Sequence, residues 1–140
     1  GRAEFGPRAL GNRSLIADVR YDVQDTVNTI KRRQKYRPFA PAILEEFADE
    51  YFDGPMNEYM QFTSWAKHDY APVTHVDGSA RVQIVRKDCE SVFRKVIEEY
   101  YDRTGVPMLL NTSLNIRGRP MVNDEHDREL WEQKYDVKVF

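Results

Sequence analysis

VPMLLNTSLN, residues 106–115, is the stretch from which the fold is best deduced. Five apolar residues in a row, VPMLL, predict a short strand that is buried on both faces. The Gly105 that precedes them is typical of a helix end in the left-handed conformation, and an apolar periodicity places that helix over residues 89–103. Polar side chains directly after a buried strand are typical of ligand sites in open α/β sheets.

Outward from this stretch, strand and helix patterns alternate. Strands are expected at residues 14–19 (SLIADV), 59–66, 81–85 and 137–140 (VKVF), and the prolines of RPFAPAIL, residues 37–44, force an extended segment. Helices are expected at residues 22–34, with Asp22 as the cap, and at 45–52, 89–103 and 124–134. The apolar stripe of the 89–103 helix is expected to comprise Val92, Phe93, Val96, Ile97 and Tyr100. Such alternation predicts a single α/β (α+β) domain, residues 1–140, with a mixed sheet.

The composition is that of a charged, globular domain. Hydrophobic residues make up 41% of 140 residues and charged residues 31%, which suits one domain with a packed core. No apolar run approaches the ~20 residues that span a bilayer, so no membrane partner is expected. Cys89 is the only cysteine, and no disulfide within the chain is possible, as in cytoplasmic proteins. Because the chain starts inside an arginine-rich motif, we expect it to be part of a longer protein.

The charge is unevenly distributed around the net value of -2. Residues 1–37 carry nine Lys or Arg against four Asp or Glu, and residues 38–69 carry one against seven. A basic first quarter predicts an anionic partner. The alternative is an ordinary solvated surface.

Two basic segments supply candidate anion ligands. GRAEFGPRALGNRS, residues 1–14, spaces Arg8 and two further arginines by glycine and proline, and the planar guanidinium matches phosphate geometry. KRRQKYRPFAP, residues 31–41, contains Lys31 and Arg37. The cations at the end of the helix alternatively complement its dipole, which explains Arg37 less well because it lies beyond the helix.

Two polar segments supply further candidates. THVDGSARVQ, residues 74–83, places His75 before a strand that starts at Arg81; His75 is either a proton shuttle or phosphate contact, or a structural histidine. In NTSLN, Asn111 and Ser113 offer groups suited to a small planar polar substrate, although Asn111 also suits a turn. No hydrolase elbow surrounds Ser113 and there is no P-loop. The histidines lack recognised metal-ligand spacing, so no metal site is expected.

These four segments, in this order, resemble the C-terminal half of the NodU/CmcH-type carbamoyltransferases. The resemblance implies a YrdC-like fold, a twisted mixed sheet with flanking helices. It implies that this domain binds carbamoyl phosphate and ATP, with Mg²⁺ accompanying the nucleotide, and forms carbamoyl-adenylate. An N-terminal Kae1-like domain, absent from this sequence, would then O-carbamoylate a small-molecule hydroxyl.

The resemblance also implies roles for six residues of this chain. It implies phosphate or nucleotide contacts for Arg8, Lys31, Arg37 and Arg81, the last three with catalytic roles, and nucleotide or carbamoyl contacts for Asn111 and Ser113. The chain departs from the family at Leu114, where phenylalanine is common, and at Arg119, where an acidic residue is common. The alternative function is a non-catalytic nucleotide- or RNA-binding module. Nucleic acid is not the expected partner, because aromatic residues do not interleave with the basic run beyond Tyr36 and Phe39.

Overall fold

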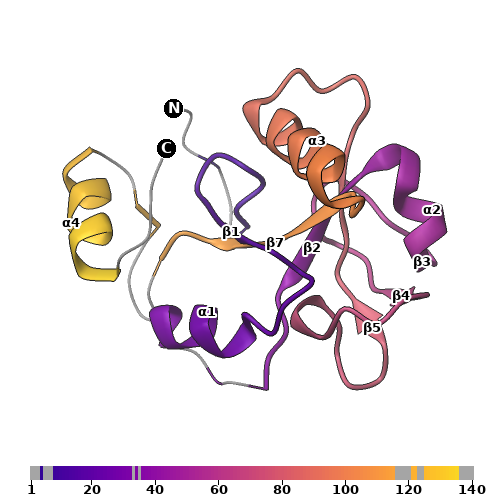
Figure 1. Cartoon of the computed structure of the whole chain (residues 1–140), viewed down its shortest axis with the longest axis horizontal. Helices are drawn as coiled ribbons and strands as arrows, with labels where there is room; N and C mark the ends of the chain where they lie inside the picture. The colour runs from indigo at the N-terminus through magenta and orange to yellow at the C-terminus, as the bar shows by residue number, and fades with distance from the viewer. Residues whose placement is uncertain are drawn as a thin grey trace.

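A computed structural model describes residues 4, 8–32, 34, 36–115, 121–122 and 125–135. Its main sheet has four strands in the order β1-β7-β2-β6 (Figure 1). These strands are β1 (Ser14–Ala17), β7 (Met108–Ser113), β2 (Ala40–Leu44) and β6 (Gln83–Val85). Strand β7 runs antiparallel to both β1 and β2, whereas β6 runs parallel to β2. The prediction of a mixed α/β domain is therefore confirmed.

A smaller antiparallel sheet and several helices complete the described part of the chain. The sheet has the order β3-β4-β5, from β3 (Phe52–Asp53), β4 (Ser64–Ala66) and β5 (Ser79–Ala80). The α-helices are α1 (Gln24–Lys31), α2 (Ala48–Tyr51), α3 (Val92–Thr104) and α4 (Glu125–Tyr135), and two 3-10 turns lie at η1 (Glu45–Phe47) and η2 (Ala71–Val73). No described helix has the length and apolar character that a bilayer crossing requires.

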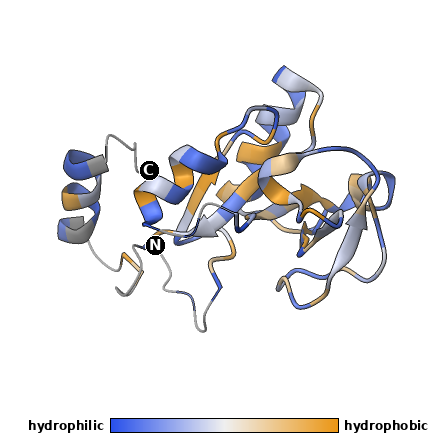
Figure 2. Ribbon diagram, turned by 90° about the horizontal axis from the view of Figure 1, so that it is seen from below, coloured by the Kyte–Doolittle hydropathy of each residue, from blue (hydrophilic) through white to orange (hydrophobic). Residues whose placement is uncertain are grey.

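Strand β2 is buried along its whole length because both faces of the main sheet are covered. Ile43, which points to one face, packs in a large apolar cluster with Val27 of α1 and with Met108 and Leu110 of β7. Leu44 points to the other face, in a second cluster with residues of α3. Strand residues alternate between faces, so one apolar strand supplies both cores. The hydrophobic colouring is accordingly concentrated at the centre of the molecule (Figure 2).

Helix α3 ends at Gly105 as the sequence predicts, but it begins at Val92 instead of residue 89, and its buried face is narrower than predicted. The Ser91 hydroxyl accepts a hydrogen bond from the Arg94 amide, and Gly105 ends the helix at a φ of 73°. Phe93 and Ile97 are buried against the sheet, whereas Val92 is 77% exposed. Val96 is also exposed, so the predicted five-residue stripe is wrong at these two valines.

Other predicted boundaries need correction. Helix α1 covers eight residues instead of 22–34: Val23 precedes it without a side-chain cap, and Arg32, at a φ of 50°, ends it. The strand predicted over 59–66 is reduced to β4, because Met60 has a φ of 55°, which no extended strand accommodates. The VKVF strand lies outside the described residues.

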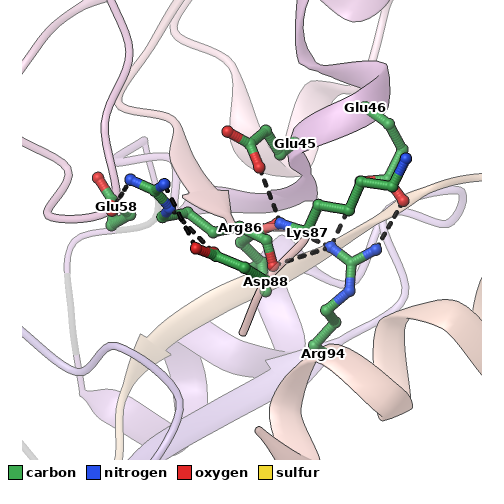
Figure 3. A network of polar contacts seen from close by, with 8 residues as sticks. Glu45, Glu46, Glu58, Arg86, Lys87, Asp88 and Arg94 are labelled. Carbon is green, nitrogen blue, oxygen red and sulfur yellow. Dashed lines mark hydrogen bonds and ion pairs between the residues drawn. The ribbon is translucent and has the colours of Figure 1, made fainter. Parts of the chain in front are cut away.

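A buried arginine joins the end of β6 to the start of α3. The Arg94 guanidinium pairs with Glu46 at 2.6 Å and donates to the carbonyl oxygen of Arg86 (Figure 3). It also pairs with Glu98 at 2.8 Å and donates to the carbonyl oxygen of Val85. Its side chain is 8% exposed, and a buried charge must be paired in this way. The network fixes the carboxyl end of β6, whose amino end reaches the candidate site.

Candidate functional site

A cavity of about 410 Å³ lies where the carboxyl end of β7 meets the amino ends of β2 and β6. The residues that line it are Arg8, Ala9, Arg37, Pro38, Phe39, Ala40, Met60, Arg81, Asn111, Thr112 and Ser113. The polar residues of NTSLN do follow an apolar run, but Asn111, Thr112 and Ser113 continue β7 instead of forming a loop. Because β7 is antiparallel to its neighbours, the cavity is not at the carboxyl edge of a parallel sheet.

Three arginines from separate parts of the chain line this cavity. Arg8 precedes β1, Arg37 lies between α1 and β2, and Arg81 lies between β5 and β6. Within the described part of the chain, none of the three guanidinium groups pairs with a carboxylate. Desolvation, followed by the charges of Arg8 and Arg37, lowers the pKa of Arg81. Unbalanced positive charge in a concave, partly desolvated site favours an anionic ligand.

The loop that carries Arg8 is held by a carboxylate that the sequence analysis did not single out. The Glu4 side chain accepts a hydrogen bond from the Leu10 amide at 2.7 Å. Gly11 has a φ of 122°, and a Cβ there would lie 2.7 Å from the Phe93 ring. Only glycine adopts this conformation and allows this approach. Glu4 and Gly11 therefore place the loop directly against α3.

Asn111 is buried beside the cavity, and its carboxamide is half satisfied. Its side-chain nitrogen donates to the Ala9 carbonyl oxygen at 3.1 Å and to Gln83 Oε1 at 2.6 Å. Its side-chain oxygen is buried and has no hydrogen-bond partner among the described residues. Since unsatisfied buried acceptors are rare and costly, this oxygen suits an N–H donor from a ligand. The turn role for Asn111 is wrong, because the residue lies in β7.

Lys31 is placed next to the cavity lining but is not part of it. Its buried ammonium contacts the Ser113 carbonyl oxygen, and lies 2.9 Å from both the carbonyl oxygen and Oδ1 of Asn115. It also lies 3.3 Å from Ser113 Oγ, which donates to Asn115 Oδ1 at 2.6 Å. The structure thus shows Lys31 ordering the end of β7. Its contact with a ligand stays a prediction.

The remaining sequence candidates lie elsewhere or serve the fold. His75 is exposed and outside the cavity lining. Asp77 accepts from the Ser79 amide at 2.9 Å, in the turn that leads to β5. Cys89 is exposed. In the part of the chain that the structure describes, no three His, Cys, Asp or Glu residues gather as a metal site would require.

Two further residues near the cavity were missed by the sequence analysis. Met60 forms an apolar wall with Phe39, and its side chain is directed by a left-handed backbone, which no sequence signal indicates for methionine. Gln83 supports Asn111 from β6. The signal available for Gln83 was its place in the THVDGSARVQ segment. Of the six predicted site residues, Arg8, Arg37, Arg81, Asn111 and Ser113 line one cavity.

Comparison with known proteins identifies the family of this chain. The family model described as "Carbamoyltransferase C-terminus" matches residues 1–139. The chain belongs to this family.

Several curated relatives resemble this carbamoyltransferase C-terminal domain over most of its length. Nodulation protein NolNO of Sinorhizobium fredii is 45% identical over 91% of the chain, and nodulation protein NolO of Bradyrhizobium diazoefficiens is 42% identical over 91%. Nodulation protein U of Rhizobium tropici is 39% identical over 89%. The matches cover only 20%, 25% and 23% of these relatives' own lengths, so the chain spans about a quarter or less of each.

Proposed function

We propose that this carbamoyltransferase domain binds carbamoyl phosphate and ATP in the cavity between β2, β6 and β7, and joins them as carbamoyl-adenylate. The observation that carries the proposal is the pairing of two features in one cavity of about 410 Å³: three arginines without carboxylate partners among the described residues, and the unpaired side-chain oxygen of Asn111. A volume of this size falls within the range of small-molecule sites.

Carbamoyl phosphate complements both features. Its phosphate group carries the negative charge that Arg8, Arg37 and Arg81 favour, and guanidinium groups can bind it with two parallel hydrogen bonds. Its carbamoyl end carries an NH₂ group, which can donate to the Asn111 oxygen.

The proposed reaction has two steps. Carbamoyl phosphate and water give carbamate and inorganic phosphate; a carbamate oxygen then attacks the α-phosphorus of ATP, and pyrophosphate leaves. The arginines stabilise the charge of the transferring groups and need no proton transfer of their own. Among the described residues, the cavity lining includes no carboxylate, the ligand that Mg²⁺ prefers. Mg²⁺ would therefore arrive with the nucleotide, and we assign it no step.

Transfer of the carbamoyl group to a hydroxyl is proposed for the rest of the parent protein. The relatives whose names refer to nodulation are about four to five times longer than their match to this chain. A Kae1-like N-terminal domain is our candidate for that step. For this chain alone we propose only the activation half-reaction.

RNA binding is less well supported by the arrangement of charge. Three of the cations converge on one concave site, whereas a nucleic-acid footprint follows a face or groove. The affinity of an RNA-binding surface also falls steeply with salt, because each neutralised phosphate releases counterions. A small-ligand site with about three cations is expected to show a much shallower salt dependence.

Isothermal titration calorimetry of the chain with carbamoyl phosphate, and separately with ATP and Mg²⁺, tests the proposal. We expect saturable binding of both, and release of pyrophosphate when they are combined. Arg37→Gln should weaken this binding. Arg103→Gln, which removes an exposed cation on α3 outside the cavity lining, is its matched control. Absence of binding by either ligand to the folded wild-type chain would refute the proposal.

A further inference from the structure

The orientation of the Asn111 carboxamide is fixed by groups that can only accept hydrogen bonds. The Ala9 carbonyl oxygen lies 3.1 Å from the Asn111 side-chain nitrogen, so the nitrogen must face it. The Leu10 carbonyl oxygen lies 3.1 Å from Gln83 Nε2 and fixes Gln83 in the same way. Gln83 Oε1 consequently faces Asn111 and accepts its second N–H at 2.6 Å. Both N–H groups of Asn111 are used, and only its oxygen remains for a ligand.

Small residues on β2 allow the two amides to meet. Asn111 on β7 is opposite Ala40, and Gln83 on β6 is opposite Ala42. Residues directly opposite each other across paired strands share a face, and Ala40 and Ala42 share one because they are two residues apart. With two methyl groups between them, Gln83 and Asn111 reach across the intervening strand.

Gln83 is also the link between this amide pair and the loop that carries Arg8. Its Oε1 holds Asn111, and its Nε2 holds the carbonyl of Leu10, next to the Ala9 carbonyl that holds Asn111 as well. Gln83 is 4% exposed and Asn111 is 1% exposed, so water does not readily replace either contact. Loss of Gln83 therefore weakens both constraints on the Asn111 amide.

We propose that Gln83 is a positioning residue that holds the oxygen of Asn111 as the free acceptor, so that the cavity selects acyl phosphates whose acyl group bears an N–H. This inference rests on the proposed function, since it explains how carbamoyl phosphate is distinguished from its near-isostere acetyl phosphate. The two ligands share the phosphate that the arginines bind. They differ in an NH₂ group, which satisfies the Asn111 oxygen, and a methyl group, which leaves it buried and unpaired.

The quantity to measure is the ratio of the affinities for carbamoyl phosphate and acetyl phosphate, because a change in the charge of the site alters both affinities alike. Leaving a buried acceptor unpaired weakens binding by roughly 5- to 100-fold, and we expect the wild-type chain to prefer carbamoyl phosphate by a factor in this range. Gln83→Leu frees the Asn111 amide and should bring the preference to within about 3-fold. Gln83→Glu keeps an acceptor for the Asn111 N–H and should retain most of the preference, even if its charge weakens binding of both ligands. Gln133→Leu, on the exposed side of α4, is the matched control.

Calorimetric titrations of carbamoyl phosphate and acetyl phosphate into each variant give the preference. Hydrogen exchange of the Asn111 side-chain amide, followed by NMR, gives a second readout: protected in wild type and Gln83→Glu, and fast in Gln83→Leu. Wild-type chain that binds both ligands equally well would overturn the inference and leave the proposed function standing. Wild-type chain that binds neither would overturn both. If Gln83→Leu folds and keeps the full preference for carbamoyl phosphate, Gln83 is not a positioning residue. If Gln83→Leu does not fold, the Gln83→Glu variant decides: loss of the preference there would also show that Gln83 does not have this role.

Discussion

Arg81→Gln is expected to stabilise the chain while weakening its ligand binding. Arg81 is half-buried, and desolvation, followed by the charges of Arg8 and Arg37, lowers its pKa. A neutral glutamine relieves two repulsive pairs, each worth about 0.2–0.5 kcal/mol by analogy with like charges on helices. With part of the desolvation cost relieved as well, the free energy of unfolding should rise by about 0.5–1 kcal/mol. For a domain of this size, that is a Tm higher by about 2–4 °C.

Carbamoyl phosphate should make the wild-type chain more stable than Arg81→Gln, the reverse of the order expected without ligand. Loss of one charge-assisted hydrogen bond costs about 1.5–3 kcal/mol of binding, so Arg81→Gln should bind carbamoyl phosphate roughly 10- to 150-fold more weakly. At a ligand concentration about 100 times its Kd, the wild-type chain gains about 2.7 kcal/mol, whereas the variant gains about 1.4 kcal/mol or less. The wild-type melting curve should therefore overtake that of the variant as ligand is added.

Thermal denaturation with and without carbamoyl phosphate is the assay for Arg81→Gln. Arg86→Gln is the control, because Arg86 pairs with Asp88 and Glu58 outside the cavity lining; it should lose a few tenths of a kcal/mol and leave the ligand response intact. If Arg81→Gln instead lowers the free energy of unfolding by more than about 1 kcal/mol, Arg81 contributes to the fold and the reasoning from unbalanced charge is refuted.

Three further variants test separate parts of the structure. Arg37→Lys keeps the charge but loses the planar fork, so binding by calorimetry should weaken about 10-fold with an unchanged Tm; an unchanged affinity would exclude a bidentate contact. Asn111→Asp replaces the donor to two acceptors by a buried carboxylate, and urea denaturation should show a loss of about 2–4 kcal/mol, so normal stability would contradict the amide orientation. Arg94→Leu removes the cation at the centre of the network of Figure 3 and should cost about 1–3 kcal/mol, against less than about 0.5 kcal/mol for the exposed Arg103→Leu; equal losses would refute the structural role of Arg94.

The elements that the sequence predicts well are those with a local signal. The burial of the central part of β7 follows from its short apolar run, and the end of α3 follows from Gly105. The extended backbone of β2 follows from the prolines of RPFAPAIL, but its burial was not predicted. The prediction fails where a residue other than glycine adopts a left-handed backbone conformation, which its residue type does not indicate. Arg32 and Met60 have positive φ, and each shortened a predicted element.

The residue types that line the candidate site were predictable from the sequence, but the residues that hold them in place were not. Arginine guanidinium groups and side-chain amides are recognisable from residue type as ligand-binding groups. Five of the predicted residues do line one cavity. Glu4 and Gln83 were missed because each one satisfies a backbone group of Leu10, its amide and its carbonyl respectively. A polar residue that satisfies a distant main-chain group has the sequence signature of a surface residue, and only the fold distinguishes the two. Lys31 shows the converse, since a cation suited to an anion ligand is placed on the carbonyl oxygens at the end of β7.

The two alanines of β2 set a limit on how this domain can be re-engineered. Buried strands ordinarily favour valine and isoleucine, so a stability-driven redesign would enlarge Ala40 and Ala42, which are 7% and 0% exposed. Larger side chains would fill the gap through which Gln83 and Asn111 meet, and the redesigned chain would gain packing while losing its amide bridge. Thermostable versions of this domain should therefore be sought at exposed positions such as Val92, with β2 left as it is.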